Sequence, residues 1–386
     1  MGAAKAIGIL LAYGVLGLSL GCVDHSVARP QHDGHADASA PQLSGEQRRP
    51  APGPTCSAQA WGAADRAQPR PTLSLEQRVV LRQWFERVAP IRAGETFGRL
   101  VARAGRTQLG VPYADTRPEL RPETLDVDLN AFECVSFVES TLALARCLWR
   151  RKPTPKCFVD EVRSLRYRHG ILAGYASRLH YFSDWLADNA RRGKLQPRTA
   201  QLGGAPHRIR FGFMSHAPLR FPALHDPSIR ARIRATEKRL SRSAPPVVRR
   251  EHIAAAQPQM RSGDVVAVVS SKPGLRVSHA GFVVRLRRGP QHPRLMHASS
   301  FHERVVLTVG SISDYMLRRP RRTGLMLFRP LPPRGTVAKS APPAGPAAPF
   351  HLRRCSEPAN ARAAVPRFAG YSRAAAAQRS TALSQP

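Results

Sequence analysis

The sequence predicts an α+β fold in which amino-terminal helices pack on an antiparallel β-sheet. Apolar residues recur at helical spacing between residues 75 and 189, whereas from residue 265 onward short β-branched or apolar runs are divided by Gly, Pro and Arg. Helices followed by a series of strands favour this class over a parallel sheet, in which the two would alternate. The 386 residues, 42% of them hydrophobic, suffice for one large domain with its own core.

The helices are expected first along the chain. Ser74 begins a Ser-x-x-Gln capping box, which predicts a helix that ends before Pro90. The apolar spacing predicts further helices over Phe97–Leu109, Phe132–Trp149, Phe158–Tyr167 and Tyr181–Asn189.

The strands are expected last, as consecutive members of one antiparallel sheet. Residues 192–260 show neither pattern clearly, and we expect them to form an insertion between the helical and β halves. The predicted strands are Val265–Val269, Ser278–Leu286, Arg294–Ala298, Val305–Val309 and Leu325–Phe328.

Residues 1–22 have the features of an export signal. Lys5 supplies a positive start, and Ala6–Leu20 is apolar, uncharged and short for a membrane span. Cys22 follows Ser-Leu-Gly, which resembles a bacterial lipoprotein cleavage box except that Ser stands where Leu is usual. Lipidation of Cys22, plain secretory cleavage and a retained anchor all remain open. We expect export to the periplasm or cell envelope, with outer-membrane attachment if Cys22 carries lipid.

The ordered domain is expected over residues 71–332. Residues 23–70 and 333–386 are rich in Ala, Pro and polar residues without periodicity, which is typical of disordered segments. The net charge is +34, and residues 71–330 alone hold 46 basic and 20 acidic residues. The domain itself is therefore cationic and suits an anionic environment. Expected export and the lack of an interleaved aromatic-basic motif exclude nucleic acid as the partner.

The six cysteines suggest one unpaired thiol in the domain. Cys147 and Cys157 flank a Pro-containing turn and could bridge in an exported chain, and Cys56 and Cys355 are possible partners in the two tails. Cys134 would then remain free.

Cys134 is expected at the start of a helix that Asn130 caps. The backbone N–H groups there favour a reactive thiolate and offer an oxyanion donor. A buried structural cysteine is the alternative.

Two histidines could complete a catalytic group. His279 and His297 lie on consecutive predicted strands, which can bring the two imidazoles within hydrogen-bond reach. His279 would serve as the base and His297 would fix its tautomer, as in hydrolysis of an amide through a thioester. Structural roles for each histidine, or a zinc site formed with Cys134, are the alternatives, and no close Cys or His pair supports zinc.

In combination and in this order, several blocks resemble the N-acetylmuramoyl-L-alanine amidase-like family, within the NlpC-type branch of the papain-like cysteine peptidases. The resemblance spans about residues 75–330. Its main blocks are Leu109–Tyr113, Phe132–Glu139, Ser278–Gly281 and Met296–Ser300, and its lesser blocks are Arg166–Gly170, Ser177–Trp185, Phe213–Ser215 and Arg321–Gly324.

The resemblance implies a papain-like, NlpC-type fold with Cys134 as nucleophile, His279 as base and His297 as orienting group. Tyr113 matches an aromatic residue that can hydrogen-bond the substrate carbonyl. This sequence differs from the family pattern at Glu133, because Asp commonly precedes the cysteine in that family.

Three further residues are candidates for substrate binding. Arg178 and His180 would form a polar wall, and Ser215 would lie at the sugar site. A salt bridge or helix cap for the first two, and core packing around the third, are the structural alternatives.

The implied activity is cleavage of the amide between N-acetylmuramic acid and L-Ala in peptidoglycan fragments, with no metal or cofactor required. One alternative is an endopeptidase that cuts γ-D-glutamyl-diaminopimelate bonds. Another is a non-catalytic cell-wall-binding lipoprotein that keeps the fold.

Overall fold

The helices of the first half begin and end close to the expected residues. In this computed structural model, which describes residues 73–114, 123–286 and 292–334, Ser74 and Gln77 form the expected capping box of α2. No helix among those residues is both long and apolar enough to cross a bilayer. The expected signal, the linker and nearly all of the tail, with Cys22, Cys56 and Cys355, lie outside the described residues. The main helices are α2 (Leu75–Val88), α3 (Phe97–Arg106), α4 (Cys134–Trp149), α5 (Pro155–Arg166) and α6 (Phe182–Arg191).

The sheet is antiparallel and has the order β2-β3-β8-β4-β5-β6-β7, with β1 paired to β8. The five expected strands are confirmed as β4 to β8. The strands are β1 (Leu195–Pro197), β2 (Ala205–Pro206), β3 (Pro246–Arg249), β4 (Val265–Ser270), β5 (Val277–Val284), β6 (Arg294–Ser299), β7 (Arg304–Leu307) and β8 (Arg322–Pro330).

Residues 192–260 are more than an insertion. They supply β1, β2 and β3 to the sheet, and they also form α7 (Pro227–Ser241) and α8 (Ile253–Ala256). A separate apolar cluster under α7 contains Phe211, Met214 and Leu240. The segment expected as an insertion between the two halves therefore contributes three strands to the shared sheet.

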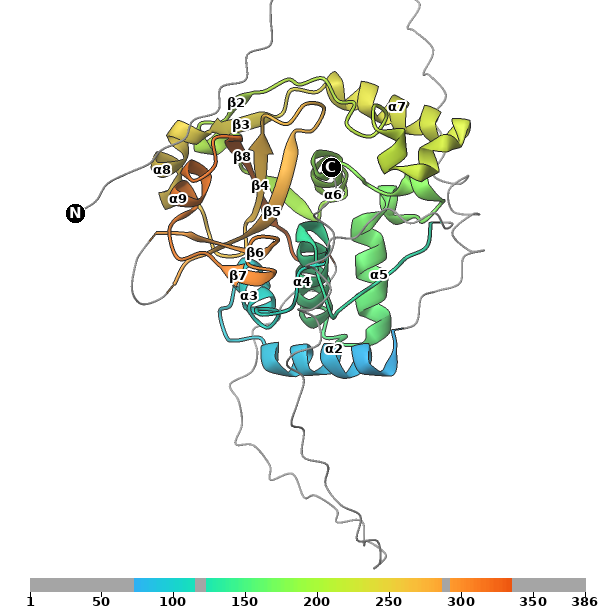
Figure 1. The fold of residues 1–386 in the computed structure, drawn as a ribbon. Coiled ribbons are helices and arrows are strands. Elements are labelled where there is room, and N and C mark those ends of the chain that lie inside the picture. Colours follow the sequence, from blue (N-terminus) through green and yellow to red (C-terminus); the bar gives the residue numbers. More distant parts are fainter. Residues whose placement is uncertain (1–72, 115–122, 287–291, 335–386) are drawn as a thin grey trace, which may run out of the picture. The chain divides into compact units, whose positions relative to one another are not determined.

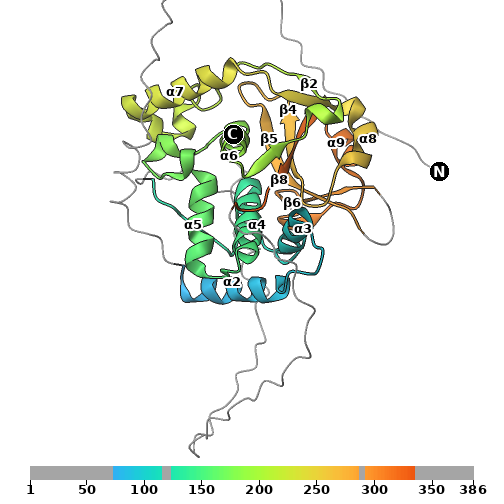
Figure 2. The same cartoon turned by 180° about the vertical axis from the view of Figure 1, so that it is seen from behind.

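Both faces of the sheet are covered. Val265, Ala267 and Val269 of β4 face the same core as α4, whereas the alternating Val266 and Val268 face α8 and the short α9 (Ile312–Leu317). Figures 1 and 2 show α4, α5 and α6 on one side of the sheet and α8 and α9 on the other. Burial on both faces explains the uninterrupted apolar run of β4.

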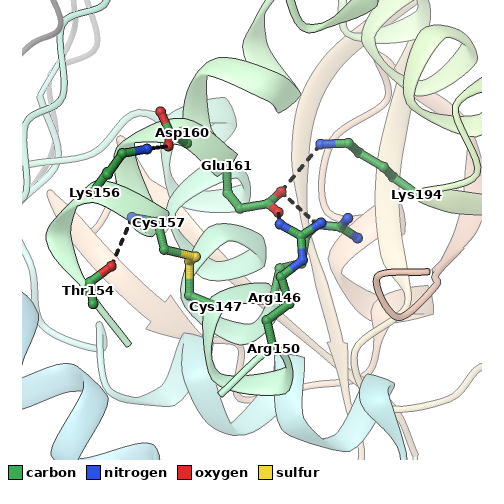
Figure 3. Close-up of a disulfide and its surroundings, with 9 residues drawn as sticks. All are labelled: Arg146, Cys147, Arg150, Thr154, Lys156, Cys157, Asp160, Glu161 and Lys194. Atoms are coloured by element: carbon green, nitrogen blue, oxygen red, sulfur yellow. Dashed lines mark hydrogen bonds and ion pairs between the residues drawn. A yellow bond between two sulfur atoms is a disulfide. The ribbon is translucent and has the colours of Figure 1, made fainter. Parts of the chain in front are cut away.

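A disulfide joins the end of α4 to the start of α5. The expected Cys147–Cys157 bridge is present, with a sulfur–sulfur distance of 2.05 Å (Figure 3). Beside it, the buried Glu161 carboxylate pairs with three cations: Arg146 at 2.8 Å, Lys194 at 3.4 Å, and Arg150. These contacts hold α4, α5 and the segment before β1 together, so α4 is anchored at its carboxyl end.

Candidate active site

Helix α4 begins at Cys134, as expected, but a different residue caps it. The Glu133 carboxylate accepts a hydrogen bond from the Ser136 N–H at 3.1 Å, and the Ser136 hydroxyl accepts one from the Glu133 N–H at 3.0 Å. This reciprocal pair is a capping box, and it makes Glu133 rather than Asn130 the N-cap. The Asn130 N–H instead donates to Asp128 at 2.8 Å. Glu133, the residue just before Cys134, therefore caps the helix that carries the thiol.

The two histidines meet across neighbouring strands. His279 on β5 and His297 on β6 are hydrogen-bonded, with 2.7 Å between His279 Nε2 and His297 Nδ1, and their rings are perpendicular at 89°. Gly281 permits this approach, because a Cβ there would lie 2.9 Å from the His297 Cβ and 2.5 Å from the Met296 oxygen. The sequence prediction that strand pairing brings the two imidazoles together is confirmed.

The thiol lies against the same strand as His279. The Cys134 thiol donates to the Glu133 carboxylate at 3.8 Å, and it lies close enough to the N–H of Ala280, the next residue of β5, for that group to lower its pKa. Cys134 is half-buried and is the one free cysteine among the described residues. The start of α4 thus brings Cys134 beside Ala280, the residue that follows His279 on β5.

The thiol is not the thiolate that its helix position suggested. Burial raises the pKa of Cys134 far above its usual range, and the neighbouring Glu133 carboxylate raises it further. The N–H groups of Ala280 and Cys134 lower the pKa but do not offset burial. Burial also raises the pKa of Glu133, and the negative charge of Glu139 adds to that shift.

The histidines are neutral at pH 7. Burial and then the positive charge of Arg322 lower the pKa of His279 to about 4. Burial and then His279 lower the pKa of His297 to about 2. A neutral thiol beside neutral imidazoles can pass its proton to a ring nitrogen during attack, which is general-base activation rather than a preformed ion pair.

Tyr315 is a neighbour that the sequence did not indicate. Its ring centre lies 5.2 Å from that of His297 and 6.3 Å from that of His279. The Arg322 guanidinium lies 3.6 Å above the Tyr315 ring and donates to the Tyr315 carbonyl. Arg322 belongs to one of the sequence blocks noted above, whereas Tyr315 lies on α9 outside all of them.

Of the four predicted substrate-binding residues, two lie near the thiol. The Tyr113 backbone bridges to Phe132, two residues before Cys134. Arg178 lies close enough to Glu133 to lower its pKa, and its guanidinium also pairs with Glu123 at 3.5 Å. The salt-bridge alternative for Arg178 is therefore present, although its side chain remains 38% exposed.

The other two residues are engaged elsewhere. His180 Nε2 lies 2.8 Å from the Tyr175 carbonyl oxygen, and the rings of these two residues pack 4.3 Å apart. Burial lowers the pKa of His180 to about 3. The Ser215 N–H donates to Glu237 of α7 at 3.1 Å. Both therefore have structural partners outside the group around Cys134.

Within the described ranges, no group of three or more His, Cys, Asp or Glu side chains has an arrangement that could hold a metal ion.

Comparison with known proteins points to one family. The model of the N-acetylmuramoyl-L-alanine amidase-like (AmiA-like) family matches residues 103–324. A solved N-acetylmuramoyl-L-alanine amidase from Bacteroides uniformis is 29% identical, with a TM-score of 0.57, over 61% of this chain and 99% of that one. A solved protein from Bacteroides fragilis, named as a candidate xylanase, is also 29% identical, with a TM-score of 0.54, over 58% of this chain and 98% of that one. No curated protein matches the chain.

Proposed function

The chain belongs to the N-acetylmuramoyl-L-alanine amidase-like family, and from this premise we propose that it hydrolyses the amide between N-acetylmuramic acid and L-Ala in peptidoglycan fragments. We further propose that it does so as a cysteine hydrolase of the NlpC-type, papain-like branch. A thiol at the head of a helix, close to Ala280 of the strand that carries His279, supports that branch.

The observation that carries the proposal is the 2.7 Å contact between His279 Nε2 and His297 Nδ1, on a strand where the next residue, Ala280, lies close enough to Cys134 to lower the pKa of its thiol. Because His297 occupies Nε2 of His279, Nδ1 of His279 is the nitrogen left for the thiol proton. His297 thus acts as a positioning residue, since it fixes the tautomer and orientation of the base.

The proposed reaction has two steps. The Cys134 sulfur attacks the amide carbonyl while its proton passes to His279, and that proton then goes to the leaving L-Ala nitrogen as the carbon–nitrogen bond breaks. Water next attacks the thioester with His279 as base, which breaks the carbon–sulfur bond and returns the proton to the thiol. In this proposal the Cys134 N–H stabilises the oxyanion, and the Tyr113 side chain hydrogen-bonds the substrate carbonyl.

Peptide carboxylates of the substrate would find positive charge near the thiol. Arg178 is the candidate because it is close to Glu133 and partly exposed. His180 and Ser215 would not touch the substrate. They would help to hold the binding surface in place through their hydrogen bonds with Tyr175 and Glu237.

The name of the Bacteroides fragilis neighbour raises glycoside hydrolysis as another activity. That chemistry typically uses two carboxyl groups that flank the scissile bond. In the described part of this site the Glu133 carboxylate caps α4, and the nearby Glu139 carboxylate is paired with Arg166 at 2.8 Å. The amidase is therefore the better fit to these side chains.

We also propose that residues 1–22 direct export, that residues 23–70 link them to the domain over 71–332, and that Cys22 carries lipid. Metabolic labelling with a radioactive fatty acid should mark the wild-type chain and leave Cys22→Ser unlabelled, with both in the envelope fraction. A fully soluble periplasmic wild-type chain without label would contradict lipidation.

Product analysis tests the activity. A defined muropeptide is incubated with the protein, and mass spectrometry should find the free sugar together with an intact stem peptide that begins with L-Ala. Cys134→Ala, folded as judged by circular dichroism, should release neither. Truncated stem peptides would instead identify the endopeptidase, and binding without turnover would identify a cell-wall-binding protein.

A further inference from the structure

A large hollow lies at the far end of α4 from the thiol. Cys134 is the first residue of this helix and Trp149, which lines the hollow, is the last, so the two are about 22 Å apart along the helix axis. Asp264, just before β4, and Leu286, just beyond β5, also line it. Its volume of about 1540 Å³ exceeds the range of about 300–1,000 Å³ that is typical of small-molecule pockets.

The lining of the hollow is strongly basic. It contains seven arginines but only two acidic residues, Glu95 and Asp264. Three of the arginines have structural partners: Arg103 pairs with Glu95 at 2.7 Å, Arg329 pairs with Asp264 at 2.8 Å, and Arg285 donates to the Met260 carbonyl at 2.7 Å. Both acidic groups are thereby already neutralised.

The other four arginines keep their charge exposed. Arg92, Arg99, Arg106 and Arg261 are all exposed, and none forms an ion pair with an acidic residue among the described residues. Arg99, Arg103 and Arg106 follow one another at four and three positions, so they share one face of α3. Glu95 balances the charge of Arg103, so the uncompensated charge on this face is that of Arg99 and Arg106, which a bound anion would offset.

The segments outside the described residues carry no excess of negative charge. Residues 335–386 hold seven basic residues and one acidic residue, residues 23–70 hold five of each, and residues 115–122 hold two of each. An anion bound in the hollow would offset the charge of the four exposed guanidinium groups.

We propose that this hollow is a binding site for a ligand with clustered phosphate groups, distinct from the site at Cys134. Each guanidinium presents a planar fork of N–H donors that matches a phosphate group through paired hydrogen bonds. The edge-to-face pair of Trp149 and Phe97, with ring centres 5.4 Å apart, gives the hollow an apolar wall for the part of the ligand that carries the phosphates. The ligand is either a soluble polyphosphorylated molecule or the headgroup layer of an anionic phospholipid.

The test compares two quadruple variants that remove the same charge. R92Q/R99Q/R106Q/R261Q changes the hollow, whereas R82Q/R232Q/R234Q/R242Q changes exposed arginines of α2, of α7 and at the end of α7. Tripolyphosphate binding is measured by titration calorimetry, and binding to phosphatidylglycerol vesicles by flotation, with phosphatidylcholine vesicles as the neutral reference.

The hollow variant should weaken binding at least about tenfold, and the control variant less than about twofold, because charge-assisted contacts are lost only in the first. Preferential loss of tripolyphosphate binding assigns the site to a soluble ligand, and loss confined to phosphatidylglycerol vesicles assigns it to a lipid surface. Equal losses in both quadruple variants, or no binding by the wild type, would overturn the proposal.

Two further measurements separate this site from the proposed amidase. Muropeptide hydrolysis should be unchanged in the hollow variant, and phosphate binding should be unchanged in Cys134→Ala. If the quadruple variant does not fold, R92Q/R261Q serves instead, because both residues lie outside helices. That double variant should still lose severalfold in affinity, and unchanged affinity would count against the site.

Discussion

The two ends of α4 carry opposite kinds of chemistry. At the Cys134 end the groups are neutral, and burial keeps them so, because it raises the pKa of the thiol and lowers that of both imidazoles. At the Trp149 end the groups are guanidinium ions, and four of them stay exposed to water. Proton transfer during a reaction benefits from low solvent access, whereas attraction of an anion needs charges that remain ionised. One helix therefore supports two sites with different requirements.

The largest expected effect is at the neutral end. His279→Gln removes the proposed base, and we expect kcat/KM for muropeptide hydrolysis to fall about a thousandfold. Steady-state assays check this, with His252→Gln as the control because His252 is exposed and distant in sequence from the site. Near-normal turnover by the His279 variant would mean that another group takes the thiol proton.

The next effect concerns the carboxyl end of α4. Cys147→Ser/Cys157→Ser removes the bridge, which closes a loop with a sequence separation of 10. We expect the free energy of unfolding to fall by about 3 kcal/mol, as urea titration measures it. Hydrolysis below the unfolding transition should stay within about twofold, since the capping box at the other end of α4 is untouched. A large loss of kcat in the folded variant would show that the two ends are coupled.

Acid stability gives a third test. The pKa values of His279 and His297 are lowered to about 4 and about 2 from 6.5, so the unfolded chain binds protons first as the pH falls. Their contribution to stability is therefore complete above pH 6.5 and declines as the pH drops from 6.5 towards 4. His279→Gln/His297→Asn should lose about 4 kcal/mol less stability than the wild type between pH 7 and pH 5, about 2 kcal/mol for each imidazole. Identical acid profiles would contradict the neutral, buried pair.

The smallest expected effect is on the reactivity of the Cys134 thiol when Glu133, the N-cap of α4, is changed. Glu133→Gln keeps an oxygen that can accept from the Ser136 N–H but removes the carboxylate charge, which raises the pKa of Cys134. Alkylation by iodoacetamide should therefore shift to lower pH and become about threefold to tenfold faster at neutral pH. A shift to higher pH would show that the carboxylate assists the thiol instead.

Much of the fold was predictable from local signals. The capping box at Ser74, the β-branched strands from Val265 and the bridge between Cys147 and Cys157 were all predicted, because each depends on residues close together in sequence. Helix α7 and strands β1 to β3 were missed. Their segments are polar or only two to four residues long, so no apolar period marks them, and their place in the sheet comes from pairing with distant strands.

The candidate site was predictable in its residues but not in its electrostatics. The pairing of His279 with His297 followed from strand order. The thiolate prediction for Cys134 was wrong because burial outweighs the N–H groups at the helix start. Glu133 was missed as the cap because Asn130 is the more usual residue type. Tyr315 was missed because its contact with the imidazoles arises only when α9 packs on the far side of the sheet.

The covalent step is tested most directly by trapping the acyl-enzyme. The wild-type protein is mixed with a defined N-acetylmuramoyl-L-alanyl peptide and quenched with acid within one turnover, and the digest is analysed by mass spectrometry. We predict a muramoyl thioester on the peptide that contains Cys134, and no such adduct in Cys134→Ala. Full hydrolytic activity in Cys134→Ala, with no adduct on the wild-type thiol, would contradict nucleophilic attack by this residue.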